Sequence, residues 1–295
     1  MDINLEYYKT FYYAAKELNY TKAAEKLYVS QSSVSQSIKS LEKALKTKLF
    51  FRKGKNMELT NEGKLLFTYV NQSINLLIQG EKAIGDLISL SYGEIKIGIS
   101  DTLSRYYLIS YLRKFHTMYP SVKIKINNRP SSVTSKLVID GELDFGIVNI
   151  NPNTDYSKLS VIKLTKVNAV IIASKELIAD VDKTYKLSEI LTYPLISLEK
   201  NSTTRKIFEN FFSENNYRFE PEMEFGSIDN IIEMVKLGVG IGFISATQSQ
   251  KFIEDDSLVI INIEKTLPSI DVGLISNKLM PNSRSTDKFI EMLTT

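Results

Sequence analysis

The chain has 295 residues, a net charge of +3 and no cysteine. The lack of cysteine excludes disulfides, zinc-thiolate sites and cysteine nucleophiles, while 43% hydrophobic and 24% charged residues predict a globular fold with a hydrophobic core. The first residues lack the basic and apolar regions of a signal peptide, and no apolar run is long enough to span a bilayer. We therefore expect a cytoplasmic protein that does not partner with a membrane.

The net charge is unevenly distributed along the chain. Residues 1–60 carry eleven basic and six acidic side chains, a net charge of +5, which leaves −2 for the rest of the chain. This asymmetry suggests that only the N-terminal segment meets a polyanion. A solvated surface with a chance excess of lysine would produce the same pattern.

Three short helices are predicted within the first 45 residues. Apolar residues between Leu5 and Leu18 recur at helical spacing. Thr21 is placed to N-cap a second helix, and Ser30 is placed to N-cap a third. The tight turn between the second and third helices predicts a helix-turn-helix, and the inward side chains of the third helix are Val34, Ile38, Leu41 and Leu45.

Short polar side chains occupy the outward face of the third helix at its beginning. Such side chains fit the DNA major groove, where glutamine can bond to adenine. Two strands flanking the turn Lys53-Gly54-Lys55 would form a wing that places cations along a phosphate backbone. We predict base-edge and nearby contacts from Gln31, Ser32, Ser35 and Gln36, and phosphate contacts from Thr21, Ser30, Lys39, Arg52, Lys53 and Lys55.

A long helix is predicted from Thr60, its N-cap, to about Leu90, and it ends at Ser91-Tyr92-Gly93. Its apolar residues alternate spacings of three and four, which is typical of helix-to-helix contact between chains. The alternative is a helix that packs on the body of its own chain. The predicted dimerisation residues are Phe67, Val70, Ile74, Leu77, Ile84 and Ile88.

From Glu94 onward, predicted strands and helices alternate, a pattern typical of an α/β fold with parallel sheet. A second subdomain begins near 161–166. The predicted strands are 95–99, 122–126, 145–148, 169–173, 195–197, 240–244, 259–263 and 272–276, and the predicted helices are 102–118, 134–140, 203–214, 229–237 and 283–293.

Several stretches of the N-terminal segment follow one another in a fixed order: Tyr20–Leu27, Val29–Ile38, Leu41-Glu42, Leu49-Phe50, Arg52 and Leu59–Gly63. In these stretches the chain resembles the LysR-type transcriptional regulators. It departs from the family at two positions. Lys46 replaces a glycine that the family usually has, which predicts left-handed strain or a different helix end, and Ser32 stands where proline is frequent. The resemblance continues into the family's sensing domain at Gly98, Tyr119-Pro120, Gly141–Asp144, Ser202–Arg205 and Leu237–Phe243, with Ser245 in place of a frequent proline.

The resemblance implies a winged helix-turn-helix at 1–60, a linker and dimerisation helix at 61–92, and an effector-sensing domain at 93–295. The sensing domain is expected to be two-lobed and similar to type 2 periplasmic binding proteins. Lobe I would comprise about 93–164 and 267–295, and lobe II about 165–266. The family's linker helices pair two chains, which implies a homodimer or homotetramer.

The resemblance also implies a ligand cleft between the lobes, where strands end and helices begin. Hydroxyl groups and helix N-termini there favour a small anion or carboxylate, although each polar cluster alone fits an ordinary helix cap. The negative charge of Asp101 would repel a purely anionic ligand nearby. The predicted effector-binding residues are Ser100, Asp101, Thr102, Ser131, Ser132, Asn201, Ser202, Thr203 and Thr204.

No enzymatic activity is predicted. His116 is the only histidine and has the position of a helix-surface residue, and the glycines at 238, 240 and 242 lack the Lys-Ser/Thr pair of a phosphate-binding loop. We expect no catalytic residue, metal or cofactor. The predicted function is sequence-specific regulation of transcription through double-stranded DNA and a small effector, and the alternatives are an architectural DNA-binding protein or a non-secreted solute-binding protein.

Overall fold

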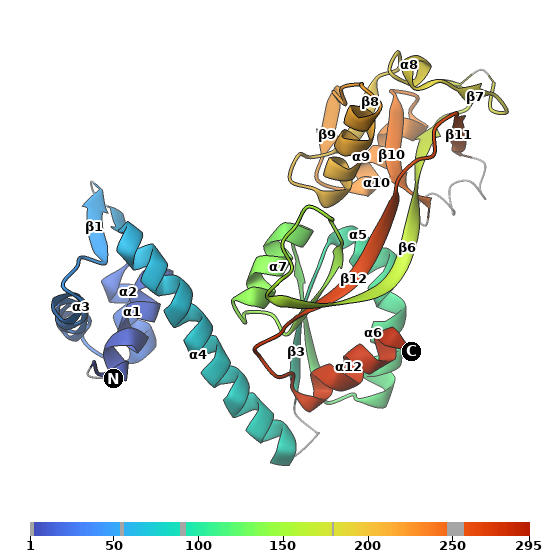
Figure 1. The fold of residues 1–295 in the computed structure, drawn as a ribbon. Coiled ribbons are helices and arrows are strands. Elements are labelled where there is room, and N and C mark those ends of the chain that lie inside the picture. The colour runs from blue at the N-terminus through green and yellow to red at the C-terminus, as the bar shows by residue number, and fades with distance from the viewer. Residues whose placement is uncertain (1–2, 54–55, 89–92, 179, 247–256) are drawn as a thin grey trace. The chain divides into compact units, whose positions relative to one another are not determined.

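A computed structural model describes residues 3–53, 56–88, 93–178, 180–246 and 257–295. The chain divides into two units, Met1–Lys82 and Ala83–Thr295 (Figure 1). None of the helices in these described ranges has both the length and the apolarity required to cross a membrane. The expected cytoplasmic location stays a prediction.

The first unit contains three helices and a two-stranded wing, and a long helix begins in it. Apolar side chains of the three short helices and the first wing strand share one core, in which Phe11 and Leu41 are completely buried. β1 and β2 pair antiparallel, with Phe50 opposite Leu59. The elements are α1 (Leu5–Glu17), α2 (Tyr20–Leu27), α3 (Gln31–Leu45), β1 (Phe50–Lys53), β2 (Asn56–Leu59) and α4 (Asn61–Ile88).

The predicted cap of α2 is wrong, whereas the predicted cap of α3 is confirmed. The Asn19 side chain accepts hydrogen bonds from the backbone N–H groups of Thr21 and Lys22 at 2.9 and 3.1 Å. Thr21 lies inside the first turn, where its hydroxyl does not cap the helix and its side chain is exposed. Ser30 has extended backbone and accepts from the Ser33 N–H at 3.1 Å.

Lys46 ends α3 in the left-handed conformation, with φ of 54°. This is the strain that the missing family glycine predicts, and it costs a residue with a Cβ about 1–2 kcal/mol. The Lys46 N–H still bonds to the carbonyl groups of Glu42 and Lys43, so the helix ends in an ordinary way. The buried Glu42 carboxylate then joins α3 to the wing, accepting from Leu49 N–H at 2.9 Å and Lys48 Nζ at 2.7 Å.

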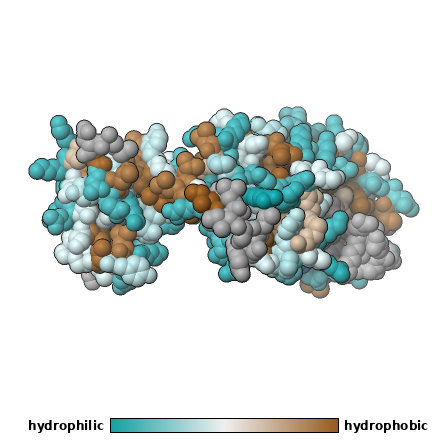
Figure 2. Space-filling model, turned by 90° about the horizontal axis from the view of Figure 1, so that it is seen from below, coloured by the Kyte–Doolittle hydropathy of each residue, from teal (hydrophilic) through white to brown (hydrophobic). Residues whose placement is uncertain are grey.

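α4 begins at the predicted cap, since the Thr60 hydroxyl accepts from the Gly63 N–H at 2.9 Å. Its first half packs on the core of its own unit through Phe67, Val70 and Ile74. At these three positions the structure supports packing on the chain's own body, because they join the same core as α1 and the wing. Figure 2 shows apolar side chains gathered over the surface of α4, and the exposed ones are Leu65, Tyr69, Leu76, Leu77, Ile78 and Ile84. The side chain of Ile88 and the predicted helix end at 91–92 lie outside the described residues.

The second unit is an α/β fold built on one sheet with the strand order β4-β3-β5-β12-β6-β10-β8-β9. Its elements are β3 (Glu94–Ile99), α5 (Asp101–Leu103), the π-helical turn η1 (Ser104–Leu108), α6 (Ile109–Met118), β4 (Lys123–Asn128), α7 (Ser131–Ile139), β5 (Phe145–Asn149), β6 (Leu159–Ala173), β7 (Thr184–Tyr185), α8 (Leu187–Ile190), β8 (Leu195–Leu198), α9 (Thr203–Glu214), β9 (Met223–Phe225), α10 (Ile228–Lys236), β10 (Ile241–Ser245), β11 (Val259–Ile263), β12 (Ser269–Asn277) and α12 (Arg284–Thr294).

Two lobes share the long strands β6 and β12 (Figure 1). Lobe I contains the parallel strands β3, β4 and β5, with α7 on one face and α6 and α12 on the other. Lobe II contains the parallel strands β8, β9 and β10, with α9 and α10 on opposite faces. Because helices cover both faces of each lobe, the strand ends and helix beginnings are left to form the rim of a site.

The predicted strand at 169–173 is only the second half of β6. Its first half, from Leu159, pairs antiparallel with β12, and its second half pairs with β10 and β11. β6 therefore carries the chain from lobe I into lobe II as one continuous strand. The short elements β7, α8 and β9 were not predicted, because each is too short to show a period.

Candidate functional site

The beginnings of α2 and α3 and the wing surround one surface hollow of about 910 Å³. Three of the predicted DNA-contacting residues, Thr21, Gln31 and Arg52, line it from these three elements. Tyr20 also lines the hollow, and burial raises the pKa of its phenol to about 12. Burial thus further disfavours ionisation of a phenol that is already neutral at physiological pH.

The other predicted base-edge residues lie on the first turns of α3. Gln31, Ser32 and Gln36 are exposed and Ser35 is half-buried. The Ser30 hydroxyl is already engaged, since it lies 2.8 Å from each of the hydroxyls of Ser32 and Ser33 and caps the helix. The start of α3 therefore presents amides and hydroxyls with one glutamine at its tip.

The basic residues flank this polar surface. Arg52 and Lys53 are exposed on β1, and Lys39 is exposed on α3. Lys53 Nζ lies 4.0 Å from a Glu58 carboxylate oxygen, whereas Arg52 has no acidic partner among the residues that the structure describes. Lys55 lies outside the described residues. Cations along a polar helix start form a surface suited to a polyanion.

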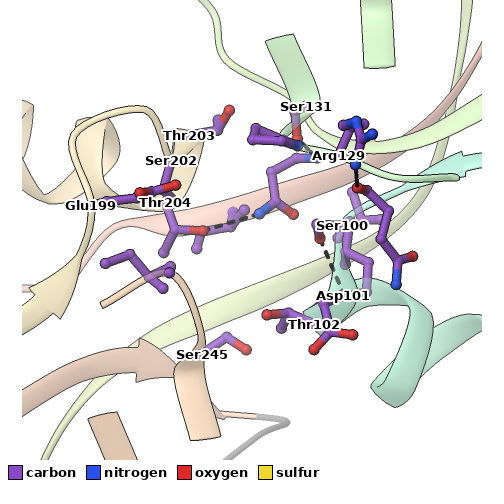
Figure 3. A pocket seen from close by; sticks show the side chains of 18 of the residues that line it. Ser100, Asp101, Thr102, Arg129, Ser131, Glu199, Ser202, Thr203, Thr204 and Ser245 are labelled. Carbon is purple, nitrogen blue, oxygen red and sulfur yellow. Dashed lines mark hydrogen bonds between the residues drawn. The ribbon is translucent and has the colours of Figure 1, made fainter. Parts of the chain in front are cut away.

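A second hollow, of about 220 Å³, lies between the two lobes (Figure 3). Lobe I reaches it with the beginnings of α5 and α7, and lobe II reaches it with the beginning of α9. We call it the interlobe cavity. Its polar lining residues are Ser100, Asp101, Thr102, Asn128, Arg129, Ser131, Asn149, Glu199, Ser202, Thr203, Thr204 and Ser245.

Two polar contacts join the lobes around this cavity. Asn149 Nδ2 donates to Thr204 Oγ1 at 3.0 Å, and the Arg105 guanidinium lies 2.8 Å from the Asp229 carboxylate. Burial, together with the Asp229 carboxylate, raises the pKa of Tyr106 beside this ion pair. The lobes thus meet through groups that a change in cleft opening would separate.

Seven of the nine residues predicted for the effector site line the interlobe cavity, and Ser132 and Asn201 do not. Ser132 follows Ser131 along α7, so a rotation of roughly 100° points it away from the cavity, and its side chain is exposed. Some hydroxyls also serve as caps: Ser100 accepts from Leu103 N–H, and Ser202 accepts from Arg205 N–H.

Sequence reasoning missed five polar residues of the cavity, all of them at strand ends. Asn128 ends β4 and Arg129 follows it, Asn149 ends β5, Glu199 follows β8, and Ser245 ends β10. The rule that ligands bind at the carboxyl ends of parallel strands would have found them. The prediction instead followed the hydroxyl clusters, and the strand at 122–126 was predicted two residues too short at its end. His116, as expected, is exposed on α6.

Comparisons with known proteins cover nearly the whole chain. Residues 5–64 match the family described as "Bacterial regulatory helix-turn-helix protein, lysR family", and residues 90–295 match "LysR substrate binding domain". A probable RuBisCO transcriptional regulator of Thalassiosira pseudonana is 30% identical over 99% of this chain and 97% of its own length. One from Synechocystis sp. is 30% identical over 94% of this chain and 81% of its own length.

Solved structures of similar fold include a full-length OxyR variant from Pseudomonas aeruginosa, with a TM-score of 0.73, 17% identity and coverage of 99% of this chain and 95% of that one. CbnR, a LysR family transcriptional regulator, gives a TM-score of 0.65 at 16% identity and 98% coverage of both chains. The winged helix-turn-helix and the two-lobed α/β unit are therefore both family features, and the chain belongs to the LysR family of DNA-binding transcriptional regulators.

Proposed function

We propose that this regulator reads base edges with the start of α3 and contacts phosphates with the wing and the start of α2. The observation that carries the proposal is the shared hollow, which Gln31, Arg52 and Thr21 line from three different elements. Gln31 supplies an amide for adenine, and Arg52 supplies a cation for a phosphate. CbnR is also known in complex with its target DNA, and that structure has the same fold, with a TM-score of 0.64.

Replacing Arg52 with alanine should weaken binding to every duplex by a similar factor. One lost phosphate contact flattens the plot of log affinity against log salt concentration by about 0.9. The measurement is fluorescence anisotropy with two unrelated duplexes across a salt series. Lys43→Ala is the matched control, because Lys43 is an exposed cation at the opposite end of α3. An unchanged salt slope for Arg52→Ala would remove the wing from the DNA interface.

We propose that the protein acts as a dimer or a pair of dimers that uses the exposed part of α4. Leu77 and Ile84 belong to the predicted seam and are 65% and 62% exposed. Two-fold pairing would let two copies of α3 address successive half-sites. The contact between two copies of α4 would be supported indirectly by the side chains that pack α4 on its own domain, Phe67, Val70 and Ile74.

Replacing Leu77 with lysine should dissociate the dimer, because it places a charge in an apolar seam. Sedimentation velocity at micromolar concentration should show a shift from dimer to monomer. Leu65→Lys is the matched control, since Leu65 is 64% exposed on another stripe of the same helix. If only Leu65→Lys dissociates the protein, the seam through Leu77 is the wrong one.

We propose that the interlobe cavity binds the effector through a carboxylate or small anion. Arg129 would pair with the negative charge, and the hydroxyls of Thr203 and Thr204 at the start of α9 would add hydrogen bonds. The lobe division at about 165 and 267 belongs to this proposal. Binding would change the angle between the lobes and so change the geometry of the bound DNA.

Replacing Arg129 with glutamine should reduce the affinity for such a ligand at least tenfold, because charge-assisted hydrogen bonds contribute about 1.5–3 kcal/mol. The measurement is a thermal-shift titration of the full chain with small carboxylates, since a ligand raises stability by mass action. Lys200→Gln removes the same charge from an exposed position that does not line the cavity. Equal losses in both variants would contradict a specific role for Arg129.

A further inference from the structure

We propose that the ligand of the interlobe cavity is a zwitterion that carries an ammonium group as well as a carboxylate, as amino acids do. This inference rests on the proposed effector role of the cavity and narrows its chemistry. The cavity is lined by two acidic side chains, Asp101 and Glu199, and one basic side chain, Arg129. A ligand with a negative charge alone would leave both carboxylates unmatched.

The Asp101 carboxylate is not used by the helix that begins with it. The Ser100 hydroxyl caps this helix, accepting from the Leu103 N–H at 3.3 Å. Asp101 is exposed at the start of α5 and lines the cavity. In the ranges that the structure describes, its carboxylate has neither a hydrogen-bond donor nor a cation beside it.

Glu199 has the same properties in the other lobe. Its backbone is fixed, since its N–H donates to the Phe225 carbonyl at 3.0 Å and its carbonyl accepts from the Ser202 N–H at 2.9 Å. Its side chain is exposed and has no hydrogen-bond or ion-pair partner within the described part of the chain. Figure 3 shows Glu199 on lobe II and Asp101 on lobe I, so each lobe offers one such carboxylate to an ammonium group in the cavity.

Arg129 supplies the complementary charge for a carboxylate. One guanidinium nitrogen donates to the Asn128 carbonyl at 2.9 Å, which orients the group and leaves its other donors available. No acidic side chain pairs with it among the described residues. Hydroxyl donors of Thr203 and Thr204 stand across the cavity on α9. The guanidinium and these hydroxyls together would hold the carboxylate end of the ligand.

The size and the remaining lining of the cavity favour a small ligand with a short apolar part. Its volume of about 220 Å³ is below the 300–1,000 Å³ typical of pockets for drug-sized molecules. Leu103, Val167 and Val272 provide apolar surface beside the charged groups. The charged lining sums to −1, which disfavours acidic amino acids relative to neutral and basic ones.

The test compares matched triads of probes by calorimetry and thermal shift on the full chain. Each triad contains an amino acid, the acid without its amine, and the amine without its carboxylate. Leucine is compared with 4-methylpentanoate and 3-methylbutylamine, and the same is done for every protein amino acid and for γ-aminobutyrate. At least one amino acid should bind, and its two partners should bind at least tenfold more weakly.

Two variants locate the ammonium group. Asp101→Asn or Glu199→Gln should weaken binding of that amino acid about tenfold or more, while the affinity for the matched carboxylate stays the same or rises, and the variant that does so identifies the carboxylate that holds the ammonium group. The control is Glu214→Gln, which removes an exposed carboxylate at the far end of α9. A loss of amino acid binding in the control equal to that in the cavity variants would contradict the assignment.

The outcomes separate this inference from the effector role itself. If a carboxylate without an amine binds as tightly as its amino acid, the zwitterion inference is wrong and the proposed effector site stands. If an amine without a carboxylate binds as tightly, the inference fails and Arg129 loses its proposed role. If no probe of any triad binds, both the zwitterion inference and the proposed carboxylate site are overturned.

Discussion

Replacing Gly63 with alanine should destabilise the first unit by about 3 kcal/mol and abolish DNA binding at 37 °C. Gly63 is buried at the start of α4, and a Cβ there would overlap the carbonyl oxygen of Leu49. This carbonyl cannot move away, because it accepts the Thr60 N–H at 3.0 Å. The wing and α4 would have to separate, and the hollow lined by Gln31 and Arg52 would lose its shape.

Gly80→Ala is the matched control for this prediction. Gly80 lies in the same helix, and a Cβ there would meet no atom within 4 Å. Alanine should therefore stabilise α4 by up to about 1 kcal/mol, which is its helix propensity relative to glycine. Hydrogen exchange of α1–α4 in the full chain measures both effects locally. Similar exchange in the two variants would contradict the close approach of Gly63 to Leu49.

Replacing Arg205 with alanine should destabilise lobe II by about 3 kcal/mol. The side chain is only 2% exposed and lies 2.9 and 3.4 Å from the carboxylates of Glu209 and Glu224. Its guanidinium also stacks over the Phe219 ring at 4.7 Å. Alanine removes the packing of the aliphatic stem and leaves two carboxylates close together without a cation.

The effect of Arg205→Ala should reach the interlobe cavity. Arg205 donates to the carbonyl of Leu198 at 3.4 Å, and Leu198 and Glu199 line the cavity. Urea unfolding followed by hydrogen exchange in α9 and β8 measures the loss. Arg218→Ala is the control, because Arg218 pairs with Glu220 at 3.8 Å while 91% exposed, and such exposed pairs contribute less than about 1 kcal/mol. Equal destabilisation by both changes would contradict a structural role for the buried pair.

The elements that sequence reasoning predicted well are those in which local chemistry and burial agree. α9 has the predicted bounds of 203–214, because the Ser202 cap and the buried phenylalanines at 208, 211 and 212 support the same helix. α3 likewise begins after Ser30 and buries the predicted Val34, Ile38 and Leu41. At α2 the cap was predicted at Thr21, but Asn19 caps the helix, because a cap must precede the first helical turn.

The seam of α4 shows what a period alone cannot determine. Phe67, Val70, Ile74 and Leu77 share one stripe of the helix, yet the first three contact their own domain and Leu77 is exposed. Apolar residues at helical spacing indicate that one face of a helix is buried. They do not indicate whether its own domain or a second chain covers that face. That distinction depends on where the first unit ends along the helix, which is a tertiary property.

The candidate effector site was predicted in part for a similar reason. Hydroxyls at helix starts are visible in a sequence, and Ser100, Ser131 and Thr204 do line the interlobe cavity. The charged groups that decide the ligand chemistry are Arg129 and Glu199, and each follows a strand. An alternating hydrophobic pattern does not locate the end of a strand to a single residue. Their approach across the cleft depends on the crossing strands β6 and β12, and the sequence pattern did not reveal the full length of β6.

The role of α3 as the reading helix is tested most directly by selection of duplex DNA from a random pool by the full-length protein and by its Gln31→Ala variant in parallel. The wild type should enrich a two-fold related sequence, whereas Gln31→Ala should lose preference at one base pair of each half-site while it still binds the duplex. Loss of one bidentate contact should relax discrimination there by about 1–3 kcal/mol. Identical enriched sequences for both proteins would contradict the assignment of α3 as the reading helix.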